Sequence, residues 1–293
     1  MTRDEAFEKT KHEIVGENLI ISSVDDAEKL HELFIKLRGE LFRRQIVEIM
    51  PHYRGEQKYG WDIRSGIFRP PLNIENPQVG KDLEKRAIQE FEKTIVEKIG
   101  SKVLRDIFYN KKYGKDWDLL FQAQHAGVKT TLTDWTAEII SALYFSTEKS
   151  EDNSINDSDG QIWCLIMPID LILGHGQNQS SKSFYELNPF EMNGTYVINP
   201  SSYFDDIENR IFEYRMFKQK GRFVVSSNDT CNIPLNKHSG IAKYFFQIKI
   251  PAKFKQNIRE ELAERKVNRA YMYYDEDPDG QNLITEINKT IFG

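Results

Sequence analysis

Apolar residues recur at every third or fourth position in two long segments of the chain, and this spacing predicts two amphipathic helices. The first helix starts at Ser23, with Asp26 three residues later as in a typical helix start, and Gly39 ends it. The second helix covers residues 81–99, and Gly100 stops it. The apolar positions of the second helix are Leu83, Ala87, Phe91, Ile95 and Ile99. Both helices are expected to bury one stripe against a core.

Shorter patterns predict the remaining elements. Further helices are expected at 116–125, 137–146, 252–265 and within 270–291. Strands are expected at 18–22, 46–54, 161–167, 195–198, 222–225 and 244–250. Residues 148–160 are acidic and polar, as in an exposed loop. Helices dominate the first half and strands the second, which predicts one α+β domain with helices packed on a mixed or antiparallel sheet. Residues 1–39 form its lead-in and 40–293 its body.

Composition narrows the function classes. The chain has 293 residues, of which 39% are hydrophobic and 12% aromatic, as in a globular protein. Its net charge of -5 disfavours binding to nucleic acid through phosphate neutralisation. Two cysteines without a CxxC pair predict no zinc site. No apolar run approaches the ~20 residues of a membrane span, and no signal peptide is apparent, so a cytoplasmic protein without a membrane partner is expected.

Four blocks of sequence combine aromatic, arginine and glycine residues in patterns that suit a ligand site. The first block is Tyr53-Arg54-Gly55-Glu56-Gln57, followed by Trp61 and Ile67-Phe68-Arg69. The second starts with Gln124-His125-Ala126-Gly127, continues through Leu132 and Asp134-Trp135-Thr136, and ends with Ala142-Leu143-Tyr144-Phe145. The third is Arg215-x3-Gln219-x-Gly221-x-Phe223, and the fourth is Asp277-Pro278-Asp279-Gly280. Together they resemble the FRG-domain family from about residue 40 to the end of the chain. Two positions depart from the family pattern, because Thr131 stands where arginine is usual and Thr133 where leucine is usual. The resemblance therefore implies no anion-binding arginine at position 131.

The residue types of these blocks leave structural and ligand-binding interpretations open. Arg54 beside Gly55 suits an anion or a pyrophosphate, and the alternative is an internal ion pair with a carboxylate such as Asp134. His125 could shuttle a proton, bind a ligand or bond a carbonyl, and Gln124 beside it favours a polar pocket. Thr136 is expected near a helix start, either as a cap or facing a phosphate-bearing ligand.

The order of the blocks is also similar to that of toxin-type mono-ADP-ribosyltransferases. That similarity implies an ADP-ribosyltransferase-like fold with NAD as co-substrate, held by Tyr53, Arg54, Gln124, Asp134, Trp135 and Thr136. It implies catalytic roles for Arg54, His125 and Gln219. It also calls for a carboxylate near the ribose, but Gly221 stands at the expected glutamate position. Glu56, Glu138 or Glu213 could supply that carboxylate.

Three hypotheses follow for function. The first is an NAD-using ADP-ribosyltransferase-like enzyme or NAD glycohydrolase, such as a bacterial toxin or phage-defence effector with a protein or nucleic-acid acceptor. The second is a non-catalytic module that recognises a nucleotide, a nucleic-acid end or a modified protein through an arginine-lined pocket. The third, ranked last, is phosphodiester hydrolysis with His125 and His52.

A calcium-loop pattern lies near the end of the chain, from Asp275 to Glu286. It occurs once, whereas such loops usually pair. Pro278 and Asn282 also occupy unfavourable positions within it. The sequence therefore predicts no metal.

Overall fold

The computed structural model describes residues 3–16, 19–44, 50–99, 115–167, 172–173, 187–198, 219–273 and 289–291. Helices and one sheet alternate along these residues in a mixed α+β arrangement, as the sequence predicted. The helices are α1 (Arg3–Ile14), α2 (Val24–Arg43), α3 (Pro77–Ile99), α5 (Lys115–Ala126), α6 (Ile139–Thr147), α7 (Asn153–Asn156), α9 (Lys255–Glu264) and α10 (Arg269–Met272), and the 3-10 turns are η1 (Gly66–Phe68), η5 (Leu235–Lys237), η6 (Ala242–Tyr244) and η7 (Ala252–Phe254).

Strands from both halves of the chain form one seven-stranded sheet in the order β4-β5-β6-β2-β1-β3-β7. The strands are β1 (His52–Glu56), β2 (Thr133–Thr136), β3 (Gly160–Leu165), β4 (Ile172–Leu173), β5 (Tyr196–Ile198), β6 (Gly221–Val225) and β7 (Phe245–Ile250). All neighbouring pairs are antiparallel except β4 and β5, which are parallel. Strand β1 lies inside the sheet, between β2 and β3, so it has a neighbouring strand on each side.

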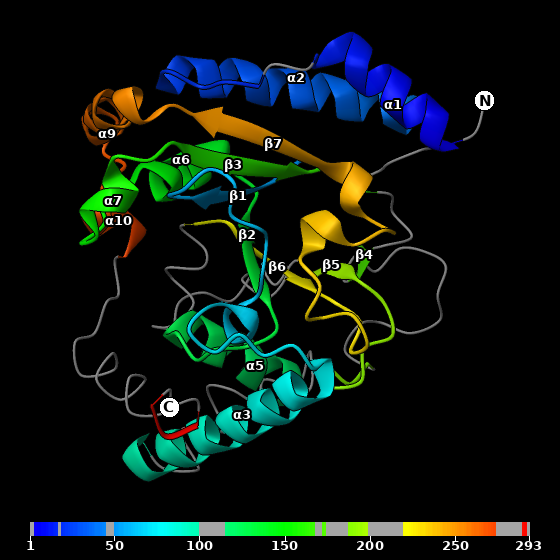
Figure 1. Ribbon diagram of the computed structural model, residues 1–293, viewed down its shortest axis with the longest axis vertical. Helices are drawn as coiled ribbons and strands as arrows, with labels where there is room; N and C mark the ends of the chain where they lie inside the picture. Colours follow the sequence, from blue (N-terminus) through cyan, green and yellow to red (C-terminus); the bar gives the residue numbers. More distant parts are fainter. Residues whose placement is uncertain are drawn as a thin grey trace.

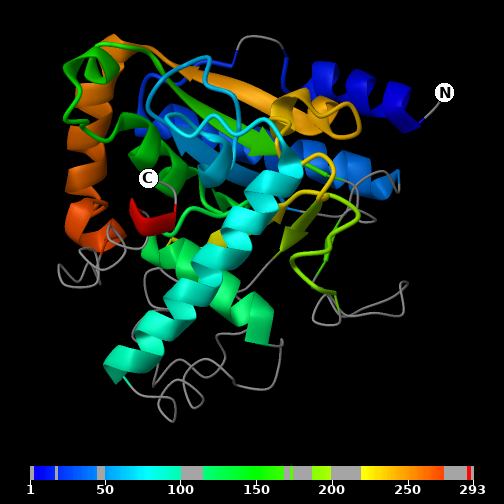
Figure 2. The same ribbon diagram turned by 60° about the horizontal axis from the view of Figure 1, so that its bottom comes forward.

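Two groups of helices pack at different ends of the sheet (Figure 1). Helices α1 and α2 lie along β7, while α3 and α5 lie together near the other end, and Figure 2 shows α3 crossing in front of α5. The larger core cluster joins α2 and α6 to β1, β3 and β7 through residues such as Phe34, Leu143 and Ile248. The smaller cluster joins α3 and α5 to β6, where Phe121 stacks on Phe223 with ring centroids 5.0 Å apart.

The start of α2 confirms the prediction of a helix beginning at Ser23. The Ser23 hydroxyl accepts a hydrogen bond from the Asp26 backbone N–H at 3.1 Å, which satisfies one of the amides that a helix start leaves open. The predicted end at Gly39 is wrong, because α2 continues to Arg43. A glycine inside a helix costs only about 1 kcal/mol, and the apolar stripe continues through buried Leu41.

Other boundaries differ from the sequence prediction in informative ways. Residues 133–136, interpreted as a turn, form strand β2, and the loop at 148–160 contains the short helix α7. Residues 18–22 contribute a single parallel bridge, from Ile20 to Lys249. The calcium-loop pattern at 275–286 and the Arg215 end of the third block lie outside the described residues.

Helix α6 packs closely on strand β1 at Gly55. A Cβ atom at this position would lie 1.9 Å from the Ala142 carbonyl oxygen and 2.9 Å from the Ser146 backbone nitrogen. Both contacts are with backbone atoms, so neither can move aside without shifting α6. The space beside Gly55 is therefore filled by a helix, and the glycine is required for packing.

We expect Gly55→Ala to lower the free energy of unfolding by more than about 2 kcal/mol, because the added methyl group overpacks the junction of β1 and α6. Urea denaturation followed by circular dichroism measures the change. Gly39→Ala is the matched control, since a Cβ at Gly39 meets nothing within 4 Å. That control should raise stability by roughly 0.5–1 kcal/mol. Equal stability of Gly55→Ala and the wild type would contradict this packing.

Candidate functional site

Arg54 and Glu56 form a buried ion pair on β1, an interior strand of the sheet. Only 8% of Arg54 and 7% of Glu56 is exposed. Arg54 Nε donates to Glu56 Oε1 at 3.0 Å, and Arg54 Nη1 donates to the Asp134 carbonyl oxygen at 2.7 Å. Because side chains alternate along a strand, both residues point away from the side on which Tyr53 and Gly55 meet α2 and α6. The predicted internal ion pair of Arg54 is thus present, but its partner is Glu56.

Gln161 extends this pair across the sheet. It lies opposite Glu56 on β3 and is fully buried. Its Nε2 donates to Glu56 Oε2 at 2.7 Å and to the Trp61 carbonyl oxygen at 2.8 Å. Its Oε1 accepts from the Gly60 backbone N–H and from Gln247 Nε2, each at 2.8 Å. Every polar atom of this amide is bonded, so the Glu56 carboxylate is held from two sides.

A second guanidinium, that of Arg69, lies within the electrostatic reach of Arg54. The Arg54 charge is the main reason that the pKa of Arg69 falls to about 10, and burial contributes further. The carboxylates of Glu56 and Asp134 act in the opposite direction on the same pKa. The charges of Arg54, Glu56 and Asp134, on β1 and β2, therefore all act on the Arg69 guanidinium.

Several hydrogen-bond donors at this site have no acceptor among the residues that the structure describes. Arg69 uses its Nε, which donates to the Arg64 carbonyl at 2.8 Å, whereas its two Nη atoms have no described partner. Trp163 lies directly opposite Arg54 on β3, and its buried indole Nε1 also lacks one. So does the buried hydroxyl of Ser65. Arg69 is only half-buried, whereas the Trp163 and Ser65 atoms are buried, and buried donors without acceptors are uncommon in native proteins and call for an explanation.

Asp134 and Gln124 form the outer part of the site. Gln124 Nε2 donates to both carboxylate oxygens of Asp134 at 2.9 Å, and the Thr130 hydroxyl donates to Gln124 Oε1. The Asp134 side chain is exposed. The structure thus brings together Arg54, Gln124 and Asp134 of the residues named from the sequence. Arg69 was noted only as part of a motif, and its place beside Arg54 depends on a loop path that no local pattern encodes.

Three of the sequence-named residues face the protein interior. The Tyr53 hydroxyl lies 2.7 Å from His31 Nδ1 of α2, and burial raises the Tyr53 pKa. Trp135 is 3% exposed, donates to Thr133 Oγ1 at 3.0 Å and packs on Phe245. The Thr136 hydroxyl accepts from the Glu138 backbone N–H at 3.0 Å in a Ser/Thr turn just before α6, whose N-cap residue, Glu138, makes no side-chain cap hydrogen bond.

Gln219 lies near the other end of β2 from the Arg54–Glu56 pair. Its carbonyl oxygen accepts from the Thr136 hydroxyl at 2.6 Å, and its Nε2 donates to the Met272 carbonyl oxygen at 2.7 Å. Its side chain amide is thus held by α10. The His125 side chain and Glu213 lie outside the described part of the structure, and His125 contributes only its backbone, within α5.

Glu138, another carboxylate named from the sequence, pairs with Lys220 and is 35% exposed. Glu56 is therefore the one of the two described candidates that contacts Arg54. Its position two residues after Arg54 on one strand is a signal that the sequence offered, because residues i and i+2 share a side of a strand.

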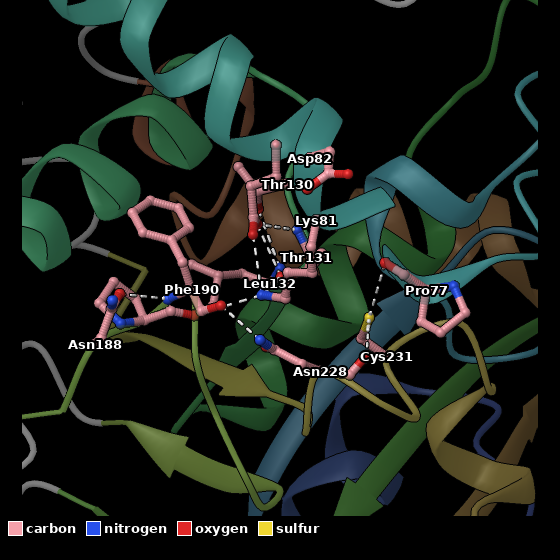
Figure 3. A network of polar contacts seen from close by, with 12 residues as sticks. Pro77, Lys81, Asp82, Thr130, Thr131, Leu132, Asn188, Phe190, Asn228 and Cys231 are labelled. Carbon is pink, nitrogen blue, oxygen red and sulfur yellow. Dashed lines mark hydrogen bonds and ion pairs between the residues drawn. The ribbon is translucent and has the colours of Figure 1, made fainter. Parts of the chain in front are cut away.

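A second buried ion pair supports the segment that leads into β2 (Figure 3). Lys81 Nζ, on α3, lies 3.0 Å from Glu84 Oε2 and 2.8 Å from Thr131 Oγ1. Glu84 Oε1 accepts from the backbone N–H and from the hydroxyl of Thr131. The cationic group beside position 131 thus comes from α3, which gives the threonine found there a structural role. The network ties α3 to the strand that carries Asp134.

Metal and membrane signals are both lacking in the described ranges. Within them, no three His, Cys, Asp or Glu side chains are grouped so that they could hold a metal ion. No described helix has the length and apolar character needed to cross a membrane.

Comparison with known families identifies the part of the chain that carries the site. Residues 51–154 match the family model of the FRG domain, which confirms the family inferred from the sequence blocks. The match includes Arg54, Glu56, Arg69, Gln124 and Asp134. No curated protein and no solved structure matched the chain.

We expect Glu84→Gln to lower the free energy of unfolding by about 3–5 kcal/mol, because it leaves the Lys81 ammonium buried without its counter-charge. Denaturant titration measures the loss. Glu40→Gln is the matched control: it removes one carboxylate from the exposed Arg43–Glu40 pair of α2 and should cost less than about 1 kcal/mol. Adding Lys81→Met to Glu84→Gln should recover part of the stability. If the two glutamate variants lose the same amount, the buried network does not hold α3.

Proposed function

We propose that this FRG-domain protein binds NAD, with the diphosphate at the Arg54–Arg69 pair, and breaks the bond between ribose and nicotinamide to transfer or hydrolyse the ADP-ribosyl group. The observation that carries the proposal is the pair of neighbouring guanidiniums with unused donors, next to a buried carboxylate. An enzyme of this kind would suit a toxin or a phage-defence effector.

The charge pattern favours a diphosphate as the bound group. Two like charges close together repel, as the lowered Arg69 pKa indicates, and a bound anion relieves that repulsion. Guanidinium groups bind phosphate oxygens in a bidentate geometry. The Trp163 indole N–H, opposite Arg54, could donate to a further oxygen of the same ligand. A diphosphate supplies several acceptor oxygens at once, which is what these donors lack.

Glu56 is the carboxylate that we assign to the chemical step. As the C–N bond to nicotinamide breaks, the nicotinamide leaves with the bonding electron pair and positive charge develops on the ribose. A carboxylate near the ribose stabilises that charge. Water or another acceptor then forms the new bond at the same carbon and loses its proton. The ion pair with Arg54 and the hydrogen bond from Gln161 hold the Glu56 carboxylate in a fixed orientation.

The arrangement of the blocks gives further support. Arg54 lies on β1, the Thr133–Thr136 block is β2, and Gly221 begins β6, and these three strands are neighbours in the sheet. Blocks far apart in the sequence that resemble one ordered motif of ADP-ribosyltransferases are therefore adjacent in space.

A second candidate is a nucleotide-binding module without turnover. It is favoured by the loop before β6, where Gly221 occupies the position expected for glutamate and the Gln219 amide is already bound to the Met272 carbonyl. In that case the same two arginines would bind the ligand and no bond would break.

Calorimetric titration with NAD and with ADP-ribose tests binding. Arg69→Gln should weaken the binding of both ligands by about 10-fold or more, the order expected for losing one charge-assisted hydrogen bond. We choose Arg69 because its side chain makes one described hydrogen bond, so its loss should leave the fold intact. Arg43→Gln, at the exposed end of α2, removes the same charge and should leave the affinity for both ligands unchanged. A folded wild type that binds neither ligand rules out the proposal.

Release of nicotinamide from NAD separates the two candidates. The wild type should release it, and Glu56→Gln should lower the rate by about 100-fold, the order found when one charge-stabilising group is removed. Circular dichroism of the variant checks that the fold survives the loss of the ion pair. Tight NAD binding without nicotinamide release, with and without added acceptors, would favour the binding module.

A further inference from the structure

Two large aromatic side chains stand exposed on the turn that follows β1. Tyr59 and Trp61 are each 42% exposed, although both are bulky and partly apolar. The chain has four tryptophans, and the other three, Trp117, Trp135 and Trp163, are 1%, 3% and 7% exposed. Trp61 is therefore the tryptophan that is open to solvent, and its exposure needs a reason.

The backbone of this turn is firmly held, even though its side chains are exposed. The buried Gln161 side chain donates from Nε2 to the Trp61 backbone carbonyl oxygen and accepts at Oε1 from the Gly60 backbone N–H, each at 2.8 Å. The Tyr59 backbone N–H donates to the Asp159 carbonyl oxygen at 2.6 Å. On the far side of the turn, Asn236 Nδ2 donates to Asp62 Oδ1 at 3.1 Å. An exposed ring on a fixed backbone is a preorganised surface, which lowers the entropy lost when a ligand binds to it.

Hydrogen bonds connect this turn directly to the buried ion pair. Arg54 donates to Glu56, Gln161 donates to the other oxygen of Glu56, and the same Gln161 nitrogen donates to the Trp61 carbonyl. The exposed indole is thus attached to the turn nearest the charged end of β1. Its neighbour Tyr59 is already covered by a cation, because Lys249 Nζ lies 5.3 Å from its ring centroid.

We propose that Trp61 is the stacking platform for a planar base of the nucleotide whose diphosphate binds at Arg54 and Arg69. This inference rests on the proposed function and deepens it, because it names the part of the ligand that a diphosphate alone does not contain. An indole face stacks on any base, so the ring could be the adenine or the nicotinamide. The ligands chosen for the test distinguish adenine from nicotinamide as the stacked ring.

The test compares Trp61→Ala with the matched control Tyr59→Ala by calorimetric titration with four ligands. These are NAD, ADP-ribose, nicotinamide mononucleotide and inorganic pyrophosphate. Trp61→Ala should weaken the binding of NAD by about 10-fold, as expected for losing one stacked base, and should leave the affinity for pyrophosphate unchanged. Weaker ADP-ribose binding identifies adenine as the stacked ring, and weaker mononucleotide binding identifies nicotinamide. Tyr59→Ala should bind all four ligands as the wild type does.

Intrinsic fluorescence gives an independent readout, since Trp61 is the exposed tryptophan. NAD should quench the fluorescence of the wild type, and Trp61→Ala should lose the part of the quenching that comes from Trp61, while any contribution of Trp163 opposite Arg54 remains. If Trp61→Ala binds NAD as tightly as the wild type, the stacking proposal is wrong while the diphosphate site stands. If the variant also loses pyrophosphate, Trp61 supports the arginine site and is not a base platform. If the wild type binds none of the four ligands, the stacking proposal and the proposed function both fail.

Discussion

Arg54 and Glu56 carry opposite charges on the interior strand β1, where little of either side chain is exposed. Neither charge could remain there alone, because an unpaired buried ion costs several kcal/mol. Their pairing fixes both side chains on one side of β1, and the oxygen of Glu56 that Arg54 does not use recruits Gln161. Gln161 in turn fixes the backbone at Gly60 and Trp61. The position of the turn that borders the site therefore follows from one ion pair.

Because side chains alternate along β1, Tyr53 and Gly55 lie on one side of the strand and Arg54 and Glu56 on the other. Tyr53 and Gly55 serve the helices, since Tyr53 contacts His31 of α2 and Gly55 leaves room for the backbone of α6. Arg54 and Glu56 point the other way, toward Trp163 and the segment that contains Arg69. The tyrosine and glycine of the Tyr-Arg-Gly motif thus hold the strand in place, while the arginine lies on the opposite side of the strand, in the buried pair with Glu56. A strand between two neighbours, with helices on one side, is a rigid base for such a group.

The sequence predicted the parts of the fold that are local. Helix α2 followed from the Ser23 cap, and β3 from its unbroken apolar run, because capping and burial leave marks within a few residues. Strand β2 was missed, since its four residues carry a polar, alternating pattern that also suits a turn and are held by pairing with β6. At the site, Arg54 was found from its motif. Its partner Glu56 was named only as one of three candidate carboxylates, although both residues share one side of β1. The approach of Arg69 was missed, because it depends on the path of the loop from β1 to α3.

Donor and acceptor counts at the site explain why an anion is the expected ligand. The acidic groups are already bound: Glu56 by Arg54 and Gln161, and both oxygens of Asp134 by Gln124. The hydrogen-bond donors, in contrast, are incompletely used, since within the described residues the Arg69 Nη atoms and the Trp163 indole N–H have no acceptor. A metal ion would find no free carboxylate oxygen as a ligand at the Arg54–Glu56 pair, because both oxygens of Glu56 already accept hydrogen bonds. A ligand rich in acceptor oxygens would complete the hydrogen bonds that the protein leaves open, and a base attached to that ligand could reach the exposed ring of Trp61.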